Sequence, residues 1–460
     1  MEPNIKDYYG NIVRITSYEV GFDWLMPFQK QNAKESTGSG FFIDDIGHIL
    51  TCSHCVEDAM HIYVEIPNEG NNKYEVIVKG VCPFFDLAIL QIDKTKSKYV
   101  NKSFCQLDDG KTIIEPGLET FALGYPLGQD NMKITKGIIS GQQFNFYQTD
   151  TPINPGNSGG PLLYNNKVIG INAAGMSAHI SEGIGYSVPI QRFYNIKTLL
   201  LNKKQKVIHY PQYFGFEQMQ NSSKYINKYF KNKCDHGGVY IKDIIKKSPV
   251  SYTSLKKGDI LCKVNDIAID NFGGLQKKWM NENMSFENLL SEIGINKAVN
   301  IDFWRGKKLM SEKFKLKQFV PKIRLLYPVL ENIDYECIGG LVMMDLNINL
   351  IMILKHNDLL KYLNYSHIMD EGVVIANIII GGEFAEMKIL KSGDLITKIN
   401  DHKVSSLKDL RKAFKTKNHI IKIETNKNKM IVIPKRIFKR DDIQLRKTYN
   451  YPISKLFKHF

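Results

Sequence analysis

The glycine-rich segment around Ser158 carries the residues best suited to covalent chemistry. It reads Gly156, Asn157, Ser158, Gly159 and Gly160. A nucleophilic hydroxyl needs a tight turn, small neighbours that admit a carbonyl group, and backbone amides that converge on the developing oxyanion. Gly156 can adopt conformations that other residues avoid, and the later glycines place no side chain beside the hydroxyl. Because Gly-Asn-Ser-Gly is also common in plain turns, the motif requires partners elsewhere in the chain.

Two such partners lie upstream. His54 follows an apolar stretch and Asp86 begins another, at separations of 86 minus 54, or 32, and 158 minus 86, or 72, along the chain. The order His, Asp, Ser is that of the chymotrypsin architecture, in which histidine takes the hydroxyl proton and aspartate orients the histidine. Alone, His54 could be a hydrogen-bonded histidine at a strand end, and Asp86 could cap a turn. The three residues together predict a catalytic triad.

The elements that must position these residues change in character near residue 208. From residue 10 to about 200, short apolar segments alternate with Gly, Pro, Asn and Asp, which predicts an all-β barrel or sandwich. Further on, LKKGDILCKVNDIAI at 255–269 aligns with LKSGDLITKINDHKV at 390–404, with seven of fifteen positions identical. An amphipathic segment and another apolar strand follow each copy, so two homologous modules are expected.

Composition and charge exclude several classes of protein. The chain has 460 residues, 43% hydrophobic and 24% charged, as in ordinary globular proteins. No window approaches the ~18 uninterrupted apolar residues of a membrane helix, so no membrane span is expected. The net charge of +15 is spread widely without a basic stripe, so nucleic acid is not an expected partner. The N-terminus shows no secretory signal, and we expect a soluble intracellular protein of the cytoplasm or nucleus.

The seven cysteines do not follow the pattern of a disulfide framework or a zinc site. Their odd number and scattered positions favour free thiols. Cys52 and Cys55 flank His54, but no second Cys or His pair follows to complete four zinc ligands. The segment at 110–112 resembles only the end of a phosphate loop. We therefore expect no metal and no cofactor.

Motifs in the same order along the chain resemble the landmarks of the HtrA or Do-like protease family: GSGFFI at 38–43, the His54 and Asp86 segments, LGYPLG at 123–128, the serine motif and GIGYSVP at 183–189. Residues 12–41 and ECIGGLVMMDL at 336–346 are similar to its eukaryotic, plant-type branch with two PDZ domains. The resemblance covers nearly the whole chain. It implies a mainly β fold, a chymotrypsin-like double β-barrel followed by two PDZ-like α+β modules. The expected parts are a trypsin-like serine protease domain at 1–202, PDZ-like modules at 208–318 and 327–435, and a basic C-terminal tail at 436–460.

Carried over residue by residue, the resemblance makes Ser158 the nucleophile, His54 the base and Asp86 its orienting partner. The amides of Gly156, Asn157 and Ser158 are the expected oxyanion hole. One departure concerns the activation loop, where Thr151 and Pro152 stand in place of the two alanines usual in the family. Proline removes a backbone donor and stiffens the loop at this point.

Two further groups of residues receive expected binding roles. Ile153 and Ile184 match positions that line the primary specificity pocket, and no acidic residue lies between Ile153 and Ser158, which favours cleavage after small aliphatic residues. Phe214, Gly215 and Phe216 are expected to form a loop of the first module that binds a C-terminal carboxylate, with a plain turn between core phenylalanines as the alternative.

The function that the resemblance implies is an ATP-independent serine endopeptidase of protein quality control. It would cleave unfolded, misfolded or specific protein substrates through an acyl-enzyme, as a homo-oligomer that is a trimer or a multiple of one. Candidate oligomer contacts, which could equally be core residues, are the N-terminal aromatics Tyr8, Tyr9, Phe22, Trp24 and Phe28. The alternative is a proteolytically weak chaperone or scaffold that works through its PDZ modules. The intact triad and glycine turn favour the endopeptidase.

Overall fold

The computed structural model describes residues 4–457 except 71, 98, 100–102, 144–145, 174–182, 203–206, 211, 220–223, 231–232, 235, 276–283 and 416–418. By contacts between residues the chain forms two compact units, one of residues 1–20 and 33–320 and the other of residues 21–32 and 321–460. Unit 1 therefore contains the segment expected as the first module and, except for residues 21–32, the segment expected as the protease domain. Unit 2 contains the second module together with a short piece of the N-terminal region.

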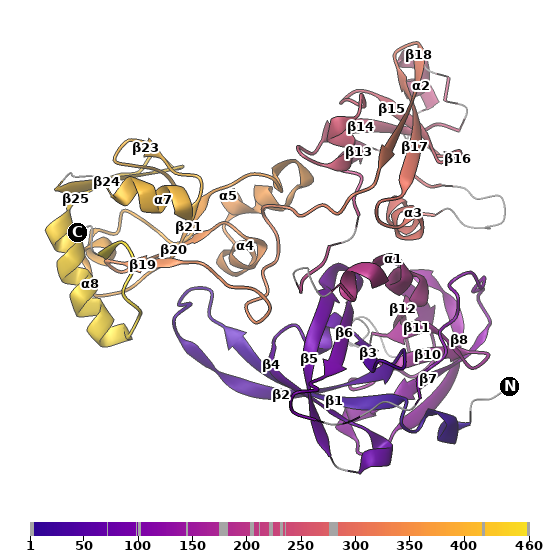
Figure 1. Cartoon of the computed structure of the whole chain (residues 1–460). Coiled ribbons are helices and arrows are strands. Elements are labelled where there is room, and N and C mark those ends of the chain that lie inside the picture. The colour runs from indigo at the N-terminus through magenta and orange to yellow at the C-terminus, as the bar shows by residue number, and fades with distance from the viewer. Residues whose placement is uncertain are drawn as a thin grey trace. The chain divides into compact units, whose positions relative to one another are not determined.

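The N-terminal half of unit 1 is built from two closed β-barrels, a chymotrypsin-like arrangement that confirms the predicted fold class (Figure 1). The first barrel has the order β1-β2-β3-β6-β5-β4. Its strands are β1 (Ile12–Phe22), β2 (Lys30–Phe42), β3 (His48–Thr51), β4 (Ala59–Glu65), β5 (Lys73–Cys82) and β6 (Leu87–Ile92). Apolar side chains such as Ile12, Ile15, Ile49 and Leu90 fill its interior.

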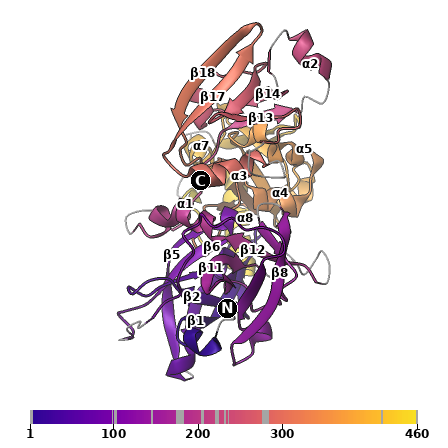
Figure 2. The ribbon, with the colours of Figure 1, turned by 90° about the vertical axis from the view of Figure 1, so that its right-hand side faces the viewer.

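The second barrel has the order β10-β11-β12-β9-β8-β7. Its strands are β7 (Glu119–Gly124), β8 (Lys133–Gln143), β9 (Phe146–Thr149), β10 (Pro161–Tyr164), β11 (Lys167–Asn172) and β12 (Gly185–Pro189), followed by helix α1 (Ile190–Leu200). Figure 2 shows β8, β11 and β12 of this barrel from a second side. Gly and Pro at the strand ends produce the tight connections that the sequence pattern indicated.

Two related sheets follow the barrels, and the second has one strand more than the first. The first contains β13 (Phe216–Met219), β14 (Val239–Ile244), β15 (Ile260–Val264), β16 (Ile267–Ala268), β17 (Ala298–Arg305) and β18 (Lys308–Lys315), with α2 (Lys224–Tyr229) and α3 (Phe286–Ile293). The second contains β19 (Glu336–Ile338), β20 (Leu341–Asp345), β21 (Val373–Ile378), β22 (Leu395–Ile399), β23 (His402–Lys403), β24 (Ile420–Thr425) and β25 (Met430–Pro434). Its helices are α4 (Ile348–Leu354), α5 (Asn357–Leu360), α6 (Glu383–Met387), α7 (Leu407–Phe414) and α8 (Lys435–Tyr449).

The repeat seen in the sequence is also a repeat of hydrogen bonds. In the first sheet, Asp259 Oδ2 accepts from the Lys256 amide at 2.7 Å, and in the second, Asp394 Oδ2 accepts from the Lys391 amide at 2.8 Å. The Asn-Asp turns that follow are equivalent as well, because Asn265 Oδ1 and Asn400 Oδ1 each accept a backbone N–H from the neighbouring strand at 2.9 Å. The shared Gly-Asp and Asn-Asp pairs therefore fix the same two turns in both copies.

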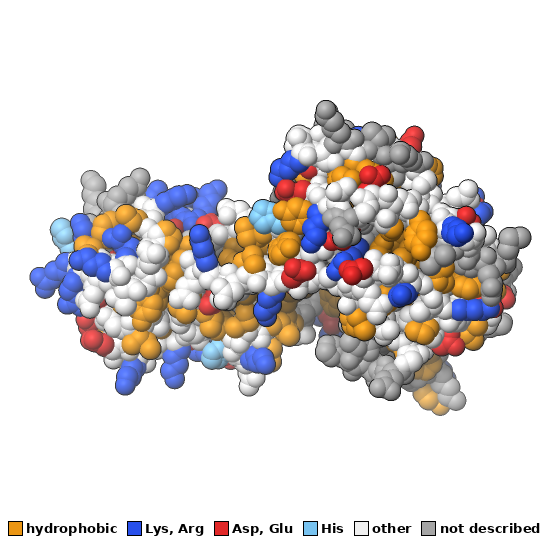
Figure 3. Space-filling view, turned by 90° about the horizontal axis from the view of Figure 1, so that it is seen from below, with side chains coloured by type: hydrophobic (Ala, Val, Ile, Leu, Met, Phe, Trp, Pro, Cys, Tyr) orange, Lys and Arg blue, Asp and Glu red, His pale blue; other side chains and the backbone are white. Residues whose placement is uncertain are grey.

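The segment expected as a basic tail begins with a packed helix. Phe438, Asp442 and Leu445 of α8 are buried, and Tyr451 and Leu456 beyond it are buried too. Basic residues occupy other positions of the same helix, which is why the segment looked like a solvated tail in sequence. On the face shown in Figure 3, Lys and Arg side chains are dispersed among hydrophobic and uncharged ones. None of the helices in the described parts of the chain is long and apolar enough to span a membrane.

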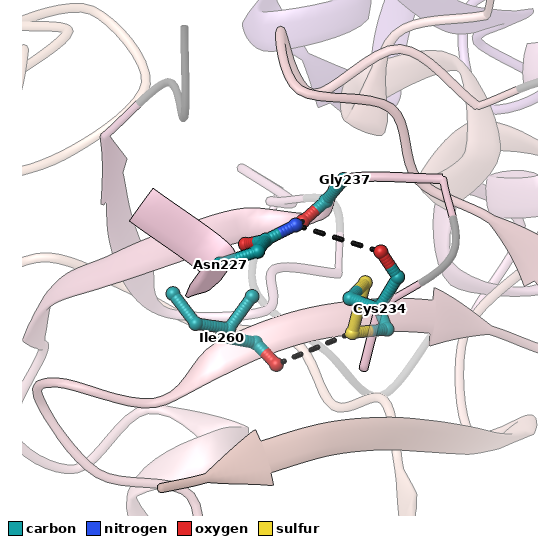
Figure 4. Close-up of a disulfide and its surroundings, with 5 residues drawn as sticks. Asn227, Cys234, Gly237 and Ile260 are labelled. Carbon is teal, nitrogen blue, oxygen red and sulfur yellow. Dashed lines mark hydrogen bonds between the residues drawn. A yellow bond between two sulfur atoms is a disulfide. The ribbon is translucent and has the colours of Figure 1, made fainter. Parts of the chain in front are cut away.

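The expectation that all cysteines are free thiols is wrong for two of them. Cys234 and Cys262 form a disulfide, with their Cα atoms 5.8 Å apart and a sequence separation of 28 positions (Figure 4). Asn227 of α2 supports this corner, because its Nδ2 donates to the Gly237 carbonyl at 2.8 Å. Folding brings the loop before β14 onto β15, a proximity that cysteine spacing alone does not reveal. The other five cysteines are free and buried.

Candidate active site

His54 and Asp86 lie at the ends of neighbouring strands of the first barrel. His54 is in a 3-10 turn, Ser53–Cys55, that follows β3, and Asp86 directly precedes β6. Because β3 and β6 pair antiparallel, with Thr51 opposite Ala88, the two side chains meet. His54 Nδ1 is 3.0 Å from Asp86 Oδ1 and 2.8 Å from Oδ2. With Nδ1 held by the carboxylate, Nε2 is the nitrogen that can accept a proton.

Two backbone features hold the carboxylate in place. The His54 amide donates to Asp86 Oδ1 at 3.0 Å, a third contact between the same two residues. Asp86 has a φ of 53°, in the left-handed region that aspartate tolerates better than most residues. The turn before β6 therefore aims the Asp86 side chain back toward His54.

The electrostatic balance at His54 favours its charged form. Burial disfavours the imidazolium, but hydrogen bonds to the side chains of Asp86 and Cys55 outweigh that effect and raise the pKa of His54. The His54 side chain remains 38% exposed, so a substrate can reach the ring. A site that stabilises imidazolium suits a base that must hold a proton during the reaction.

The turn that carries Ser158 depends on glycine at two positions. Gly156 and Gly159 have φ values of 95° and 84°. A Cβ atom on Gly156 would lie 2.3 Å from the Tyr125 carbonyl oxygen, and one on Gly159 would lie 2.1 Å from both Ser39 O and Thr51 Oγ1. Since Thr51 ends the strand that leads to His54, this close packing places the Ser158 turn against the His54 segment. Ser158 itself is buried, with 5% of its surface exposed.

The three predicted oxyanion donors are not equivalent in the structure. The Asn157 amide donates to the Asn154 carbonyl at 2.9 Å, within the turn. This donor is already engaged within the turn, which argues against Asn157 as an oxyanion donor.

Sequence reasoning did not identify Ser39, although it lies in the GSGFFI motif. Its buried hydroxyl donates to the Gly156 carbonyl at 2.7 Å and accepts from the Tyr125 amide at 3.0 Å. Its backbone N–H donates to the Ser158 carbonyl at 2.7 Å. Ser39 thus connects the first barrel to both sides of the Ser158 turn. A small polar residue between two glycines was the only signal that could have suggested this role.

Thr151 and Pro152, which stand where two alanines are usual, are held by hydrogen bonds from threonine hydroxyl groups. Thr151 Oγ1 is 2.8 Å from Thr149 Oγ1 and 3.1 Å from Thr120 Oγ1, so its side chain is bound inside the second barrel. The Pro152 carbonyl accepts from Thr135 Oγ1 at 3.0 Å. The threonines hold the loop that the proline stiffens.

The two residues predicted to line the specificity pocket lie near each other. Ile153 is buried, and a Cβ atom on Gly185 would lie 2.9 Å from its Cδ1. Ile184, the residue before Gly185, is half-buried. The structure therefore packs Ile153 against the residue that follows Ile184, while a shared pocket stays a prediction.

The predicted carboxylate loop of the first module is a tight glycine turn. Gly215 has a φ of 96°, and a Cβ atom there would lie 1.9 Å from Ser248 Cβ. The rings of Phe214 and Phe216 pack against each other and against Phe286 of α3. β13, which starts in this loop, is the edge strand of its sheet. An edge strand beside a helix is the arrangement that accepts an added peptide strand, and the two phenylalanines also serve the core.

The corresponding turn of the second module is covered by its own chain. Gly339 and Gly340 join β19 to β20, and β19 pairs with β20 from Ile338 opposite Leu341 onward. A Cβ atom on Gly339 would lie 2.6 Å from the ring of Phe438 in α8. In the second module, the turn that corresponds to the predicted peptide-binding turn of the first module is therefore packed against helix α8.

Comparison with known proteins agrees with this geometry. Residues 38–171 match the family model described as trypsin-like peptidase domain. The chain is 27% identical over 404 residues to the probable periplasmic serine endoprotease DegP-like of Buchnera aphidicola, covering 85% of this chain and 77% of that protein. It is 29% identical over 413 residues to protease Do-like 4, mitochondrial, of Arabidopsis thaliana, covering 85% and 74%.

One further serine protease and one solved structure are also similar to this chain. The serine protease Do-like HtrA of Bacillus subtilis is 32% identical over 315 residues, covering 63% of this chain and 65% of that protein. The solved structure of the HtrA-type protease AlgW with decapeptide superposes with a TM-score of 0.51 at 21% identity, covering 69% of this chain and 98% of that one. At that identity the superposition shows a shared fold.

The names of these relatives overturn the expected location in the cytoplasm or nucleus. One is named as periplasmic and another as mitochondrial. The expectation rested only on the charge and hydropathy of the N-terminal residues. Together, the double barrel, the matched peptidase domain and relatives that align over most of its length show that this chain is a serine endopeptidase similar to the HtrA and Do-like proteases.

Proposed function

We propose that the protein cleaves peptide bonds in protein substrates through an acyl-enzyme formed on Ser158. His54 Nε2 takes the hydroxyl proton as Ser158 attacks the scissile carbonyl, and returns it to the leaving amine. Asp86 holds the Nδ1 tautomer and stabilises the imidazolium. The amides of Gly156 and Ser158 bind the oxyanion of the tetrahedral intermediate. The observation that supports this proposal most directly is the three-contact pairing of His54 with Asp86.

The test is casein digestion by the wild type beside Ser158→Ala. Alanine fits the same turn, and the expected loss in turnover is about 10⁴-fold or more because the hydroxyl forms the covalent intermediate. A matched control is Ser140→Ala, an exposed serine of β8, which should keep full activity. Size-exclusion chromatography of all three proteins checks that fold and assembly are unchanged. Substantial casein cleavage by a clean Ser158→Ala preparation would refute the assignment.

We assign different tasks to the two modules. In the first, the open edge of β13 and the Gly215 turn support capture of a substrate C-terminus as an added strand. In the second, the packing of α8 on the Gly339 turn supports a structural or assembly role. The chaperone or scaffold alternative would use the same modules, and it predicts that Ser158→Ala retains the protein's full effect on misfolded clients.

Assembly into a trimer or a multiple of one remains part of the proposal. Most of the candidate aromatics already have partners within the chain: Tyr8 is buried, and Phe22, Trp24 and Phe28 pack in an apolar cluster of unit 2. Tyr9 is 41% exposed and is the one left as a candidate contact among the five. Light scattering at micromolar concentration tests the assembly, and a monomeric mass would contradict it.

A further inference from the structure

Three side chains with different metal-binding chemistry meet at the triad. Cys52 offers a thiol sulfur, His54 a ring nitrogen and Asp86 a carboxylate oxygen, and these atoms all lie within 4.8 Å of one another. The sequence placed only Cys52 and Cys55 beside His54, which is too few ligands for a zinc site. Asp86 arrives from β6 through strand pairing and completes a group of three.

This group suits zinc better than other common divalent ions. Zinc binds cysteine sulfur at about 2.3 Å and histidine nitrogen or carboxylate oxygen at about 2.0–2.2 Å, in tetrahedral geometry. Ligand atoms in such a tetrahedron lie roughly 3.3–3.8 Å apart, so small side-chain rotations bring the three atoms into range. Magnesium and calcium prefer oxygen ligands only, whereas a mixed set of sulfur, nitrogen and oxygen is a zinc-type site. Three protein ligands leave a fourth position for water.

We propose that Zn²⁺ binds Cys52 Sγ, His54 Nδ1 and the Asp86 carboxylate, and that the bound ion switches the peptidase off. The inference rests on the proposed role of the triad. Cys52 is fully buried, and its Sγ lies 3.2 Å from the Asn172 carbonyl. His54 and Asp86 are 38% and 17% exposed, so the ion enters on their side and meets the thiol behind them.

The inhibition follows from the two nitrogens of the imidazole ring. When a metal occupies Nδ1, the single proton of the neutral ring must sit on Nε2. Nε2 then cannot accept the Ser158 proton, so the base is lost while the ring stays in place. An imidazole held in the wrong tautomer costs about 10⁴-fold in turnover when the orienting aspartate is replaced by asparagine in related chemistry. Binding displaces the Cys52 thiol proton to solvent and moves the Nδ1 proton to Nε2, with no redox change.

Cys55 provides a matched comparison for Cys52. Both are buried thiols next to His54, but Cys55 Sγ points to the Ser158 carbonyl at 3.7 Å and does not belong to the three-ligand group. Replacing either cysteine with serine removes one thiol from the same short segment. The metal proposal predicts that replacing Cys52 strongly weakens zinc inhibition and that replacing Cys55 changes it little.

The first experiment measures inhibition of peptide hydrolysis by ZnCl₂ for the wild type, Cys52→Ser and Cys55→Ser, each relative to its own metal-free rate. We expect Cys52→Ser to weaken zinc inhibition about 100-fold, because it removes one of three protein ligands, and Cys55→Ser to change it by less than about threefold. Cys52→Ala serves as a second variant in case serine disturbs the buried position. Equal inhibition of the wild type and both Cys52 variants would overturn the proposal, as would an effect confined to Cys55→Ser.

A second readout does not need catalysis. CoCl₂ added to the Ser158→Ala protein should give a thiolate-to-cobalt charge-transfer band in the near ultraviolet at one equivalent, and Ser158→Ala with Cys52→Ser should lack it. Absence of the band in the first protein would refute metal binding. Should Ser158→Ala still digest casein, the proposed function fails while the cobalt spectrum still reports on the metal site, so the two failures are distinguishable.

Discussion

The backbone N–H of Gly339 donates a hydrogen bond of 3.1 Å to Asp442 Oδ1, so the glycine turn of the second module already binds a carboxylate of its own chain. Asp442 is fully buried in α8. Its carboxylate also accepts from Arg446 Nε at 2.9 Å and from the Tyr451 hydroxyl at 3.0 Å. In a module that reads C-terminal carboxylates, this amide would be a donor for the ligand. Its internal use supports a structural role for the second module.

Replacing this carboxylate should therefore loosen the second module. Asp442→Asn keeps the shape but removes the charge opposite Arg446, and breaking such a buried pair costs about 3–5 kcal/mol. Hydrogen exchange measured by mass spectrometry should show faster exchange in β19, β20 and α8. The matched control is Asp401→Asn, at an exposed ion pair with Lys422, which should leave exchange in these elements unchanged. Unaltered protection in Asp442→Asn would show that the carboxylate does not hold the turn.

The raised pKa of His54 determines the pH dependence of the reaction. A base must be neutral to accept a proton, and its neutral fraction increases with pH through the pKa of His54. Burial lowers the pKa of His54, but the contacts with Asp86 and Cys55 raise it by more than burial lowers it. The acidic limb of kcat/KM should therefore lie above the ordinary histidine value of about 6.5. Asp86→Asn removes the charge that raises the pKa of His54, so the acidic limb should move to lower pH. The plateau value of kcat/KM should fall about 10⁴-fold.

The chain contains a suitable control for this measurement. His48 Nδ1 and Asp44 Oδ2 form a similar pair at 2.7 Å in the same barrel. Asp44→Asn should leave the acidic limb of the pH–rate profile in place. A limb that moves equally in Asp44→Asn and Asp86→Asn would mean that general charge, rather than the His54 pair, sets the profile.

Apolar residues in the expected pocket predict specificity for small aliphatic side chains. A digest of an unfolded protein should show cuts mainly after Val, Ala or Ile, because Ile153 and the half-buried Ile184 offer no charge to a basic side chain. Ile184→Ala should enlarge the pocket and raise kcat/KM for larger apolar residues about tenfold or more relative to Val. Ile46→Ala, at a 55% exposed position, is the control. A product map dominated by cuts after Lys or Arg would contradict the assignment.

Capture of a C-terminus by the first module should depend on the free carboxylate. Calorimetry with a peptide that ends in an apolar residue should show binding, and its C-terminal amide should bind much more weakly. Gly215→Ala should abolish binding of both forms, since φ is 96° at this position and the new Cβ would meet Ser248. Equal binding of acid and amide by the wild type would identify the loop as a plain turn between core phenylalanines.

Local patterns predicted an all-β barrel or sandwich and two repeated modules, because strand punctuation and the Gly-Asp and Asn-Asp turns are encoded within a few residues. The division into two barrels was implied only by the family resemblance. The meeting of His54 with Asp86 could be anticipated from their order along the chain. The contact of Gly339 with Asp442 and the disulfide of Cys234 with Cys262 could not, because they depend on which surfaces pack together in three dimensions. The buried positions of α8 were not predicted, because the Lys and Arg residues around them in sequence suggested a solvated tail. The role of Ser39 was equally hidden, since a serine between glycines has no distinctive spacing.

The assignment of residues 21–32 to unit 2 has a consequence for how the protein is made. Phe28 and Tyr451 have ring centroids 5.4 Å apart, although 451 minus 28, or 423, positions separate them. On the ribosome the tip of the β1–β2 hairpin therefore emerges long before its apolar partners in the second module. Phe28 therefore stays uncovered until the residues around Tyr451 have been made, which exposes the nascent chain to aggregation during that time. Fragments that stop after the barrels would carry the same uncovered tip permanently.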